Sequence, residues 1–349
     1  MIRKIALLFL LPILAITHYS CETDFDVTAD YKEIAIVYGL LSQNDTTHYL
    51  RITKAFLGDG NALVYALNPD SSSFGTLIDV KLLEMSDTDV LREIIFDTVT
   101  IHNKDAGDVN YLDNKGDFYA PDQLMYKANA ILDPARNYKL MVRNRSTGYE
   151  IESVTNLVLD FTITKPTAPA NNLPKLDFKR EPVSNQKIEW NSAANGRLYQ
   201  PVIQFYYKET SLPNTADTIL RFFEWIFPAV NSKSLVGGEK MIIEFSSEEF
   251  YRLCEEKVPY PDASVENNVN IRIADYFNLK FVVAGDEFST YLDVNSPTTG
   301  LLLEKPTYTN IENGLGVFSS RYTKNRIVRV GDNIKKDLMN TTELHFFAN

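Results

Sequence analysis

The stretch THYLRITKAF, residues 47–56, alternates between two kinds of position along its length. One set of alternate residues includes Leu50 and Ile52, and the other includes Tyr49 and Arg51. A period of two residues is typical of a β-strand that buries one face and exposes the other. This stretch therefore predicts a half-buried strand near the start of the fold.

Further strand-like segments follow through the first half of the chain. Each is short, and turn residues such as Gly, Asn, Asp and Pro separate it from the next. Short strands at close spacing, without a strong helix between them, are typical of a β-sandwich. We therefore predict a mainly β protein in which residues 27–160 form an immunoglobulin-like β-sandwich. The segments are IAIVYGLLS (34–42), DVKLLEMS (79–86), VLREIIFDTVTI (90–101), YKANAIL (126–132), NYKLMVRN (137–144) and GYEIESVTNLV (148–158).

The second half begins after a proline-rich stretch with Pro166, Pro169 and Pro174, which predicts a linker or a broken edge strand. A strand with Trp190, a small-residue turn and a strand ending in Tyr-Tyr follow. This pattern resembles the B–C hairpin of a fibronectin type III module, in which the tryptophan would lie in the core. We therefore predict that residues 161–349 form a fibronectin III-like β-sandwich with helical insertions.

Two helical insertions are expected. In SSEEFYRLCEEKV, residues 246–258, Ser246 and Glu249 match a capping box, and Cys254 falls on the apolar side. We expect Cys254 to be a buried, unreactive thiol. The segment DEFSTYLDV predicts a second short helix with Asp286 as its cap.

The N-terminus carries an export signal. A basic pair precedes an apolar run that is too short to span a membrane, so residues 1–20 are predicted to be a signal peptide. Cys21 follows Ser20, and the arrangement resembles that of a bacterial lipoprotein, in which Cys21 would carry the lipid. The alternative is ordinary secretion with cleavage nearby. Residues 21–26 form an acidic tether that resembles the signal for export to the outer face of the outer membrane in Bacteroidota.

Length and charge limit the function. The chain has 349 residues, 44% of them apolar, which suits about two domains with buried cores. Its formal net charge of −11 disfavours binding to nucleic acid, whose phosphates would repel it. The same charge disfavours anionic membrane surfaces unless a covalent lipid holds the protein there.

The most distinctive stretch is KPTYTNIENGLGVFSSRY, residues 305–322. It resembles the N-I-x-x-G-x-G-x-F signature of a large family of uncharacterised Bacteroidota outer-membrane lipoproteins. The resemblance implies a surface-exposed accessory lipoprotein, of a kind often encoded beside TonB-dependent receptors, and it carries over no catalytic residue. Physically, the pattern predicts a turn whose glycines adopt special backbone conformations and whose phenylalanine anchors the next strand. The signature residues are Asn310, Ile311, Gly314, Gly316 and Phe318.

Signals for chemistry are weak. The histidines that remain after removal of the leader lack metal-ligand spacing, so we expect no metal site, no cofactor and no catalytic residue. The acidic loop from Asp105 to Asp117 could supply oxygen ligands for calcium, but it lacks the spacing of a calcium-binding loop. Trp225, in the aromatic run RFFEWIFP, is either a core residue or part of a platform that binds sugar rings.

Together these features predict a non-enzymatic lipoprotein on the outer membrane, facing the cell exterior. Its expected partner is a TonB-dependent receptor or another envelope protein. One alternative is a glycan-binding lipoprotein of a polysaccharide-uptake system, for which exposed coplanar aromatic residues would include Trp225. A second alternative is a hydrolase, which would need a converging acid pair or triad that the sequence does not single out.

Overall fold

The computed structural model describes residues 32–55, 62–103, 119, 122–211, 218–260, 270–296 and 307–347. These residues form three β-sheets with a few short helices, so the prediction of a mainly β protein is confirmed. The helices are α2 (Ala62–Ala66), α3 (Pro69–Ser72), α4 (Ser247–Lys257), α5 (Asp286–Asn295) and α6 (Asp332–Thr341).

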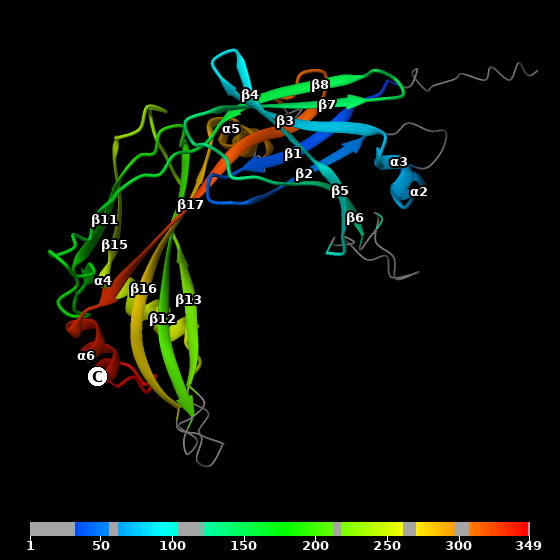
Figure 1. Cartoon of the computed structure of the whole chain (residues 1–349). Helices are drawn as coiled ribbons and strands as arrows, with labels where there is room; N and C mark the ends of the chain where they lie inside the picture. The colour runs from blue at the N-terminus through cyan, green and yellow to red at the C-terminus, as the bar shows by residue number, and fades with distance from the viewer. Residues whose placement is uncertain are drawn as a thin grey trace, which may run out of the picture.

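A sheet of ten strands runs through both halves of the molecule (Figure 1). Along its main path the order is β13 (Thr218–Ile226), β12 (Leu198–Ser211), β16 (Asn270–Ala284), β17 (Leu315–Val330), β1 (Ala35–Leu41), β2 (Thr47–Lys54), β6 (Gln123–Asn129) and β5 (Asp97–Ile101). Two short strands attach beside this path, β10 (Lys175–Leu176) on β17 and β14 (Val230–Asn231) on β12.

Two smaller sheets cover one face of the long sheet. In the N-terminal lobe the covering sheet has the order β4 (Asp89–Ile95), β3 (Ile78–Ser86), β7 (Asn137–Asn144), β8 (Glu150–Asn156). In the C-terminal lobe it has the order β15 (Lys240–Ser246), β11 (Asn185–Asn191), β9 (Ile163–Lys165).

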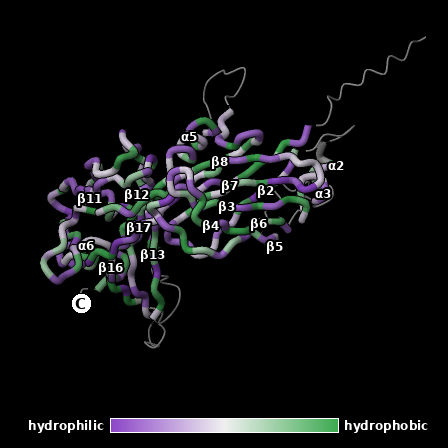
Figure 2. The backbone as a smooth tube through the Cα atoms, turned by 45° about the horizontal axis from the view of Figure 1, so that its top comes forward, coloured by the Kyte–Doolittle hydropathy of each residue, from purple (hydrophilic) through white to green (hydrophobic). Residues whose placement is uncertain are grey.

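Each lobe has its own hydrophobic core between two sheets. The N-terminal core contains Leu50 and Ile52 of β2, as the alternation in THYLRITKAF predicts. The C-terminal core contains Trp190, which is fully buried, together with Phe205 and Phe277. Along the strands of both lobes the backbone changes repeatedly between hydrophilic and hydrophobic residues (Figure 2). This alternation is the pattern expected of sheets that bury one face.

Strand β17 joins the two lobes. Its first part pairs in parallel with β1, from Leu315 to Ser320, and its second part pairs antiparallel with β16, from Arg321 to Arg329. Phe318 accordingly lies in the N-terminal core, whereas Val328 lies in the C-terminal core. A C-terminal segment therefore completes the sheet that begins with β1, although the predicted boundary at residue 160 places the two strands in different domains.

Several local predictions can be compared with the structure. Helix α4 begins as expected, because the Ser246 side chain accepts a hydrogen bond from the Glu248 backbone N–H at 3.3 Å. Helix α5 also exists, but Asp286 is not its cap: Gly285 holds that position, and the Asp286 carboxylate instead binds Arg197 at 2.6 Å.

The prediction of one strand over residues 90–101 is wrong, since β4 and β5 belong to different sheets. Helix α6 was not predicted.

The long sheet bends at β17, so the molecule has a convex and a concave side (Figure 1). The two covering sheets lie on the convex side in both lobes. The uncovered face of the long sheet therefore forms the concave side. In the part of the chain that the structure describes, no helix has the length and apolar character needed to cross a membrane.

Candidate binding surface

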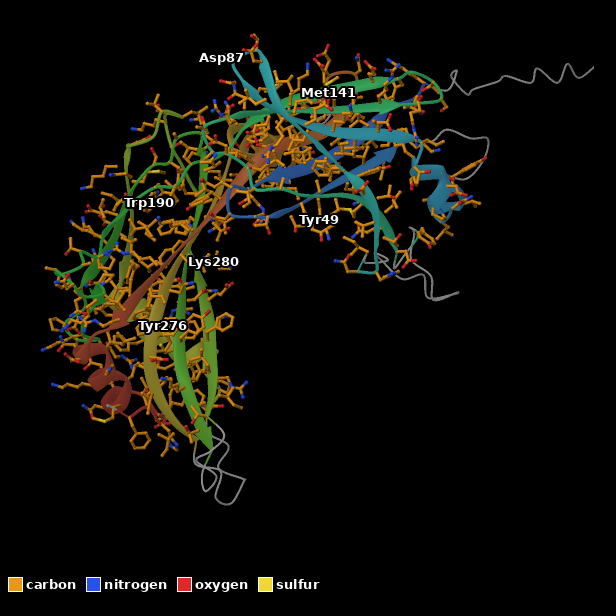
Figure 3. All side chains as sticks on the ribbon, in the orientation of Figure 1. Tyr49, Asp87, Met141, Trp190, Tyr276 and Lys280 are labelled. Carbon is orange, nitrogen blue, oxygen red and sulfur yellow. The ribbon has the colours of Figure 1, made fainter. Side chains whose placement is uncertain are left out.

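The concave face, defined as the side chains of the long sheet that point away from the two covering sheets, continues from one lobe to the other. Tyr49 belongs to this face on β2, and Lys280 and Tyr276 belong to it on β16 (Figure 3). The strand register keeps the same alternate positions on this face across the bend, because β17 pairs with both β1 and β16. One surface thus collects residues from strands at opposite ends of the sequence.

Three aromatic rings form a stacked column on the concave face of the C-terminal lobe. Phe222 on β13, Tyr206 on β12 and Tyr276 on β16 lie directly opposite one another in the strand register. The ring centres of Phe222 and Tyr206 are 5.0 Å apart at 24°, and those of Tyr206 and Tyr276 are 4.5 Å apart at 14°. Phe222 is 52% exposed. Large aromatic side chains that stay on the surface commonly anchor binding partners.

A row of polar side chains, the polar row, runs beside this aromatic column. Gln204 Nε2 donates to Glu224 Oε1 at 2.8 Å, and Asn278 Nδ2 donates to Gln204 Oε1 at 2.7 Å. Asn278 Nδ2 also lies 3.0 Å from Asn325 Oδ1, and Lys280 Nζ lies 3.6 Å from Glu224 Oε1. These contacts fix the rotamers of the row, so the surface is organised before any ligand arrives.

Helix α5 follows β16 and packs against the first part of β17 at the bend. The Ser319 hydroxyl of β17 donates to Glu287 at 2.8 Å and accepts from the Phe288 backbone N–H at 3.3 Å. Tyr291 of the helix reaches Tyr38 of β1, with the two hydroxyl oxygens 3.4 Å apart. This hydrogen bond, together with burial, raises the pKa of Tyr291 to about 12. The helix is thereby fastened to both strands at the bend.

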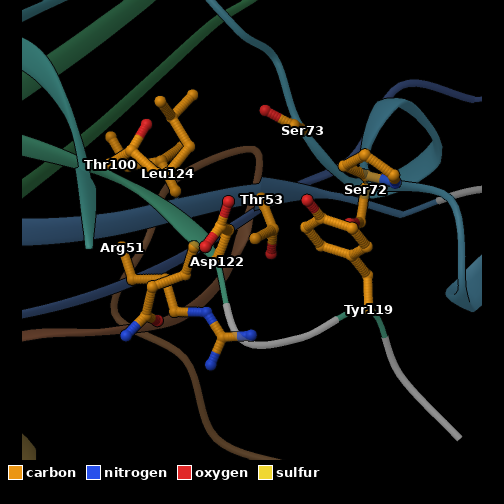
Figure 4. Close-up of a pocket in the computed structure, with 11 residues that line it drawn as sticks. Arg51, Thr53, Ser72, Ser73, Thr100, Tyr119, Asp122 and Leu124 are labelled. Carbon is orange, nitrogen blue, oxygen red and sulfur yellow. The ribbon is translucent and has the colours of Figure 1, made fainter. Parts of the chain in front are cut away.

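Two cavities open beside β2. The first, of about 460 Å³, is lined by Tyr38, Tyr49 and Tyr291 together with Arg51 and other residues. The second, of about 220 Å³, shares Arg51 and adds the carboxylate of Asp122 with hydroxyl-bearing side chains (Figure 4). Both cavities combine a guanidinium group with groups that hydrogen-bond to polar ligands.

Trp225 is not on this surface. It is only 6% exposed, and its ring packs against Phe227 at 4.7 Å and Phe245 at 4.9 Å between ring centres. A buried indole is not available as a platform for sugar rings, so this part of the glycan prediction is corrected. Phe222, three residues earlier in the same strand, points to the opposite face and is the exposed aromatic residue of that run.

The signature residues lie where β17 begins. Asn310 makes two hydrogen bonds to the backbone of Phe318, and Ile311 and Phe318 are buried in the N-terminal core. Gly316 has φ +103°, and a Cβ added there would lie 1.9 Å from the carbonyl oxygen of Val37.

A Cβ added at Gly314 would lie 2.9 Å from a methyl carbon of Ile311. The two glycines of the signature therefore meet close packing where β17 begins beside β1.

Other predicted sites lie outside the described residues. These are the signal peptide over residues 1–20, Cys21 with the tether over residues 21–26, and the acidic loop from Asp105 to Asp117.

Reactive groups are sparse in the described part of the chain. Cys254 is fully buried, and burial raises the pKa of its thiol well above the usual range. His102 contacts the Asp122 carboxylate at 2.5 Å, but no hydroxyl or thiol of the described residues hydrogen-bonds to its ring. Nor do three or more His, Cys, Asp or Glu side chains among these residues gather as a metal site.

Sequence reasoning did not identify the aromatic column. Its members come from three separate segments, and nothing in any one segment shows that the rings are neighbours. The Tyr-Tyr pair at 206–207 and the run RFFEWIFP were visible signals. Only the register that places Tyr206 beside Phe222 and Tyr276 brings them together.

No protein-family model matches this chain, and a search of curated proteins found no match either.

Proposed function

We propose that this protein is a non-enzymatic lipoprotein of the outer-membrane surface that binds an envelope protein, such as a TonB-dependent receptor, through its concave face. The observation that carries the proposal is the aromatic column on an uncovered sheet. An exposed apolar patch with a polar margin is typical of surfaces that bind proteins. Here Phe222, Tyr206 and Tyr276 supply the patch, and the polar row supplies the margin.

Attachment through a lipid on Cys21 is the second part of the proposal. It is supported by the apolar leader and by the position of the cysteine directly after it. The signature from Asn310 to Phe318 supports membership of the Bacteroidota lipoprotein family that it resembles. The pairing of a covering sheet with the long sheet in each lobe supports the finer assignment of an immunoglobulin-like and a fibronectin III-like sandwich.

The binding proposal is tested by affinity recovery of the full chain from its native membrane. A Phe222→Ala/Tyr276→Ala double variant removes two rings of the aromatic column. We expect it to lose the receptor that the unchanged protein recovers. A matched control is Val154→Ala, because Val154 is 53% exposed but lies on the covering sheet of the N-terminal lobe. Equal recovery by the double variant and the control contradicts the proposal.

Glycan binding is the second candidate, and one observation favours it. The polar row offers planar amide groups beside aromatic rings, a combination suited to hydroxyl-rich ligands. The rings stack on one another, however, so the column presents mainly ring edges, and Phe222 is its outermost ring on the edge strand. Retention of the full chain on a glycan array, lost in Phe222→Ala, together with recovery of no receptor, would favour this candidate.

A further inference from the structure

Strand β13 ends the long sheet. The strand order places β12 on one side of it and no strand on the other side within the described part of the chain. Its nine residues pair with β12 without any shift of register, from Thr218 to Ile226. One row of backbone N–H and C=O groups along β13 is therefore left without a neighbouring strand, which makes it a template for another strand.

This edge has few of the features that usually prevent strand addition. Proteins protect edges with short strands, lysine, proline, glycine-containing bulges or charged side chains. The sequence of β13, TILRFFEWI, contains no Lys, Pro or Gly, and its two charged residues are Arg221 and Glu224. The other sheet ends that the structure describes differ from it: β5 has five residues, β9 has three, and the pairing of β4 with β3 contains a register shift. Strand β15 begins with Lys240, and Glu152 of β8 already forms a β-bridge with Glu312.

Several side chains along this edge are apolar and exposed. On the concave face, Leu220 is 49% exposed, Phe222 is 52% exposed and Ile226 is 62% exposed. An edge strand that is long and regular and carries exposed apolar residues is unfavourable in water. The apolar rim of the aromatic column and the unpaired backbone thus coincide on one strand.

The charges on β13 indicate which kind of strand can pair there. Arg221 and Glu224 are three residues apart, so they point to opposite faces of the sheet. When two copies of β13 pair antiparallel about a two-fold axis perpendicular to the sheet, each face meets the same face of the other copy. Arg221 of one copy then cannot lie opposite Glu224 of the other, and self-pairing gains no charge complementarity. A different sequence can place an acidic residue beside Arg221 and a basic residue beside Glu224.

We propose that an extended segment of another polypeptide adds to the free edge of β13 as an eleventh strand of the long sheet. The proposal rests on the proposed function, since it specifies how the envelope partner is held. Main-chain hydrogen bonds would provide affinity, and alternate side chains would provide specificity. On the concave face, the incoming segment would place apolar residues beside Leu220, Phe222 and Ile226 and a basic residue beside Glu224.

Site-specific photocrosslinking in cells that make the full chain tests this mode of binding. Leu220, Phe222 and Ile226 are replaced, one at a time, by p-benzoylphenylalanine, and the attached peptides are mapped by mass spectrometry. Tyr276 on the concave face and Val154 on β8 are replaced in the same way for comparison. We expect all three positions to attach to one segment of a single partner. The attachment point should advance by two residues from Leu220 to Phe222 and by four from Phe222 to Ile226, as strand pairing requires.

A second arm blocks the edge. Leu220→Lys and Phe222→Lys place a charge on exposed positions, where folding should be retained, and should abolish attachment from position 226. Val154→Lys, at an equally exposed position on β8, should leave that attachment intact.

Several outcomes overturn the proposal: attachment to a second copy of the chain, attachment points without strand-like order, equal attachment from position 154, or no attachment from β13. Attachment from position 276 but not from β13 would overturn strand addition and leave the proposed function standing. Absence of attachment from every concave-face position would count against both.

Discussion

The side chain of Asn310 holds both backbone groups of Phe318. Its Nδ2 donates to the Phe318 carbonyl oxygen at 2.6 Å, and its Oδ1 accepts from the Phe318 N–H at 3.0 Å. Phe318 lies on β17 opposite Gly39 of β1, inside the N-terminal core. The pair of hydrogen bonds therefore fastens the segment before β17 to the strand that both lobes share.

Asn310→Ala should destabilise the protein by about 2–4 kcal/mol, because two hydrogen bonds are lost and partly buried backbone groups are left without their partners. The measurement is the free energy of unfolding in urea. Asn172→Ala is the control, since the side chain of Asn172 is exposed and accepts a bond only from the next residue's N–H. Equal losses in both variants would show that the Asn310 pair has no special role.

Gly316→Ala should prevent stable folding or cost more than about 4 kcal/mol, because the new Cβ would collide with the backbone of Val37. Gly75→Ala separates this clash from backbone strain: Gly75 also has a positive φ, +57°, but nothing lies within 4 Å of its added Cβ. Strain alone should cost about 1–2 kcal/mol there. A Gly316→Ala protein as stable as Gly75→Ala would disprove the close approach of β17 to β1.

Trp225→Ala and Phe222→Ala should affect different properties of the protein, although both residues lie on β13. Trp225→Ala empties a site between Phe227 and Phe245 and should cost about 3–5 kcal/mol of stability. Phe222→Ala removes an exposed ring and should leave the urea midpoint nearly unchanged while weakening partner recovery. A large loss of stability in Phe222→Ala would contradict its assignment to the binding surface.

His48 should make stability depend on pH. Burial lowers the pKa of His48, and the backbone carbonyl of Ala130 and the nearby Asp45 oppose this shift only in part. The folded protein therefore holds the proton less tightly than the unfolded chain. Burying His48 in its neutral form therefore stabilises the folded protein fully only above the pKa of His48 in the unfolded chain, about 6.5. This contribution to the free energy of unfolding is lost as the pH falls from there toward the lower pKa of His48 in the folded protein.

Urea unfolding at about pH 7.5 and about pH 5 measures this contribution. The unchanged protein should lose more stability between the two conditions than His48→Gln, whose amide can replace the donor to Ala130 but does not titrate. Identical losses in the two proteins would mean that His48 is not buried as a neutral group.

Part of the fold can be predicted from local pattern. The alternation in THYLRITKAF predicted β2 and its buried residues Leu50 and Ile52, and Ser246 predicted the start of α4. These predictions hold because the two-residue period of a strand and the capping of a helix depend only on neighbouring residues. Local pattern was insufficient for α5, where Asp286 forms an ion pair with Arg197, the residue directly before β12.

For the binding surface, too, local sequence pattern predicts only part of what the structure shows. The run RFFEWIFP by itself indicated a strand with large aromatic residues, but Phe222 and Trp225 are equally good candidates for either face. Packing against β15 buries Trp225, whereas register with β12 and β16 aligns Phe222 with Tyr206 and Tyr276.

The sequence alone determined that this protein is mainly β and that a helix begins after Ser246. The tertiary structure alone decided that β17 joins β1 to β16 and that, among the described residues, no sheet covers the concave side and no strand lies beyond β13. The reason is physical. Side-chain alternation is set within a strand, whereas strand partners are chosen by hydrogen bonds and packing between segments that lie most of the chain apart.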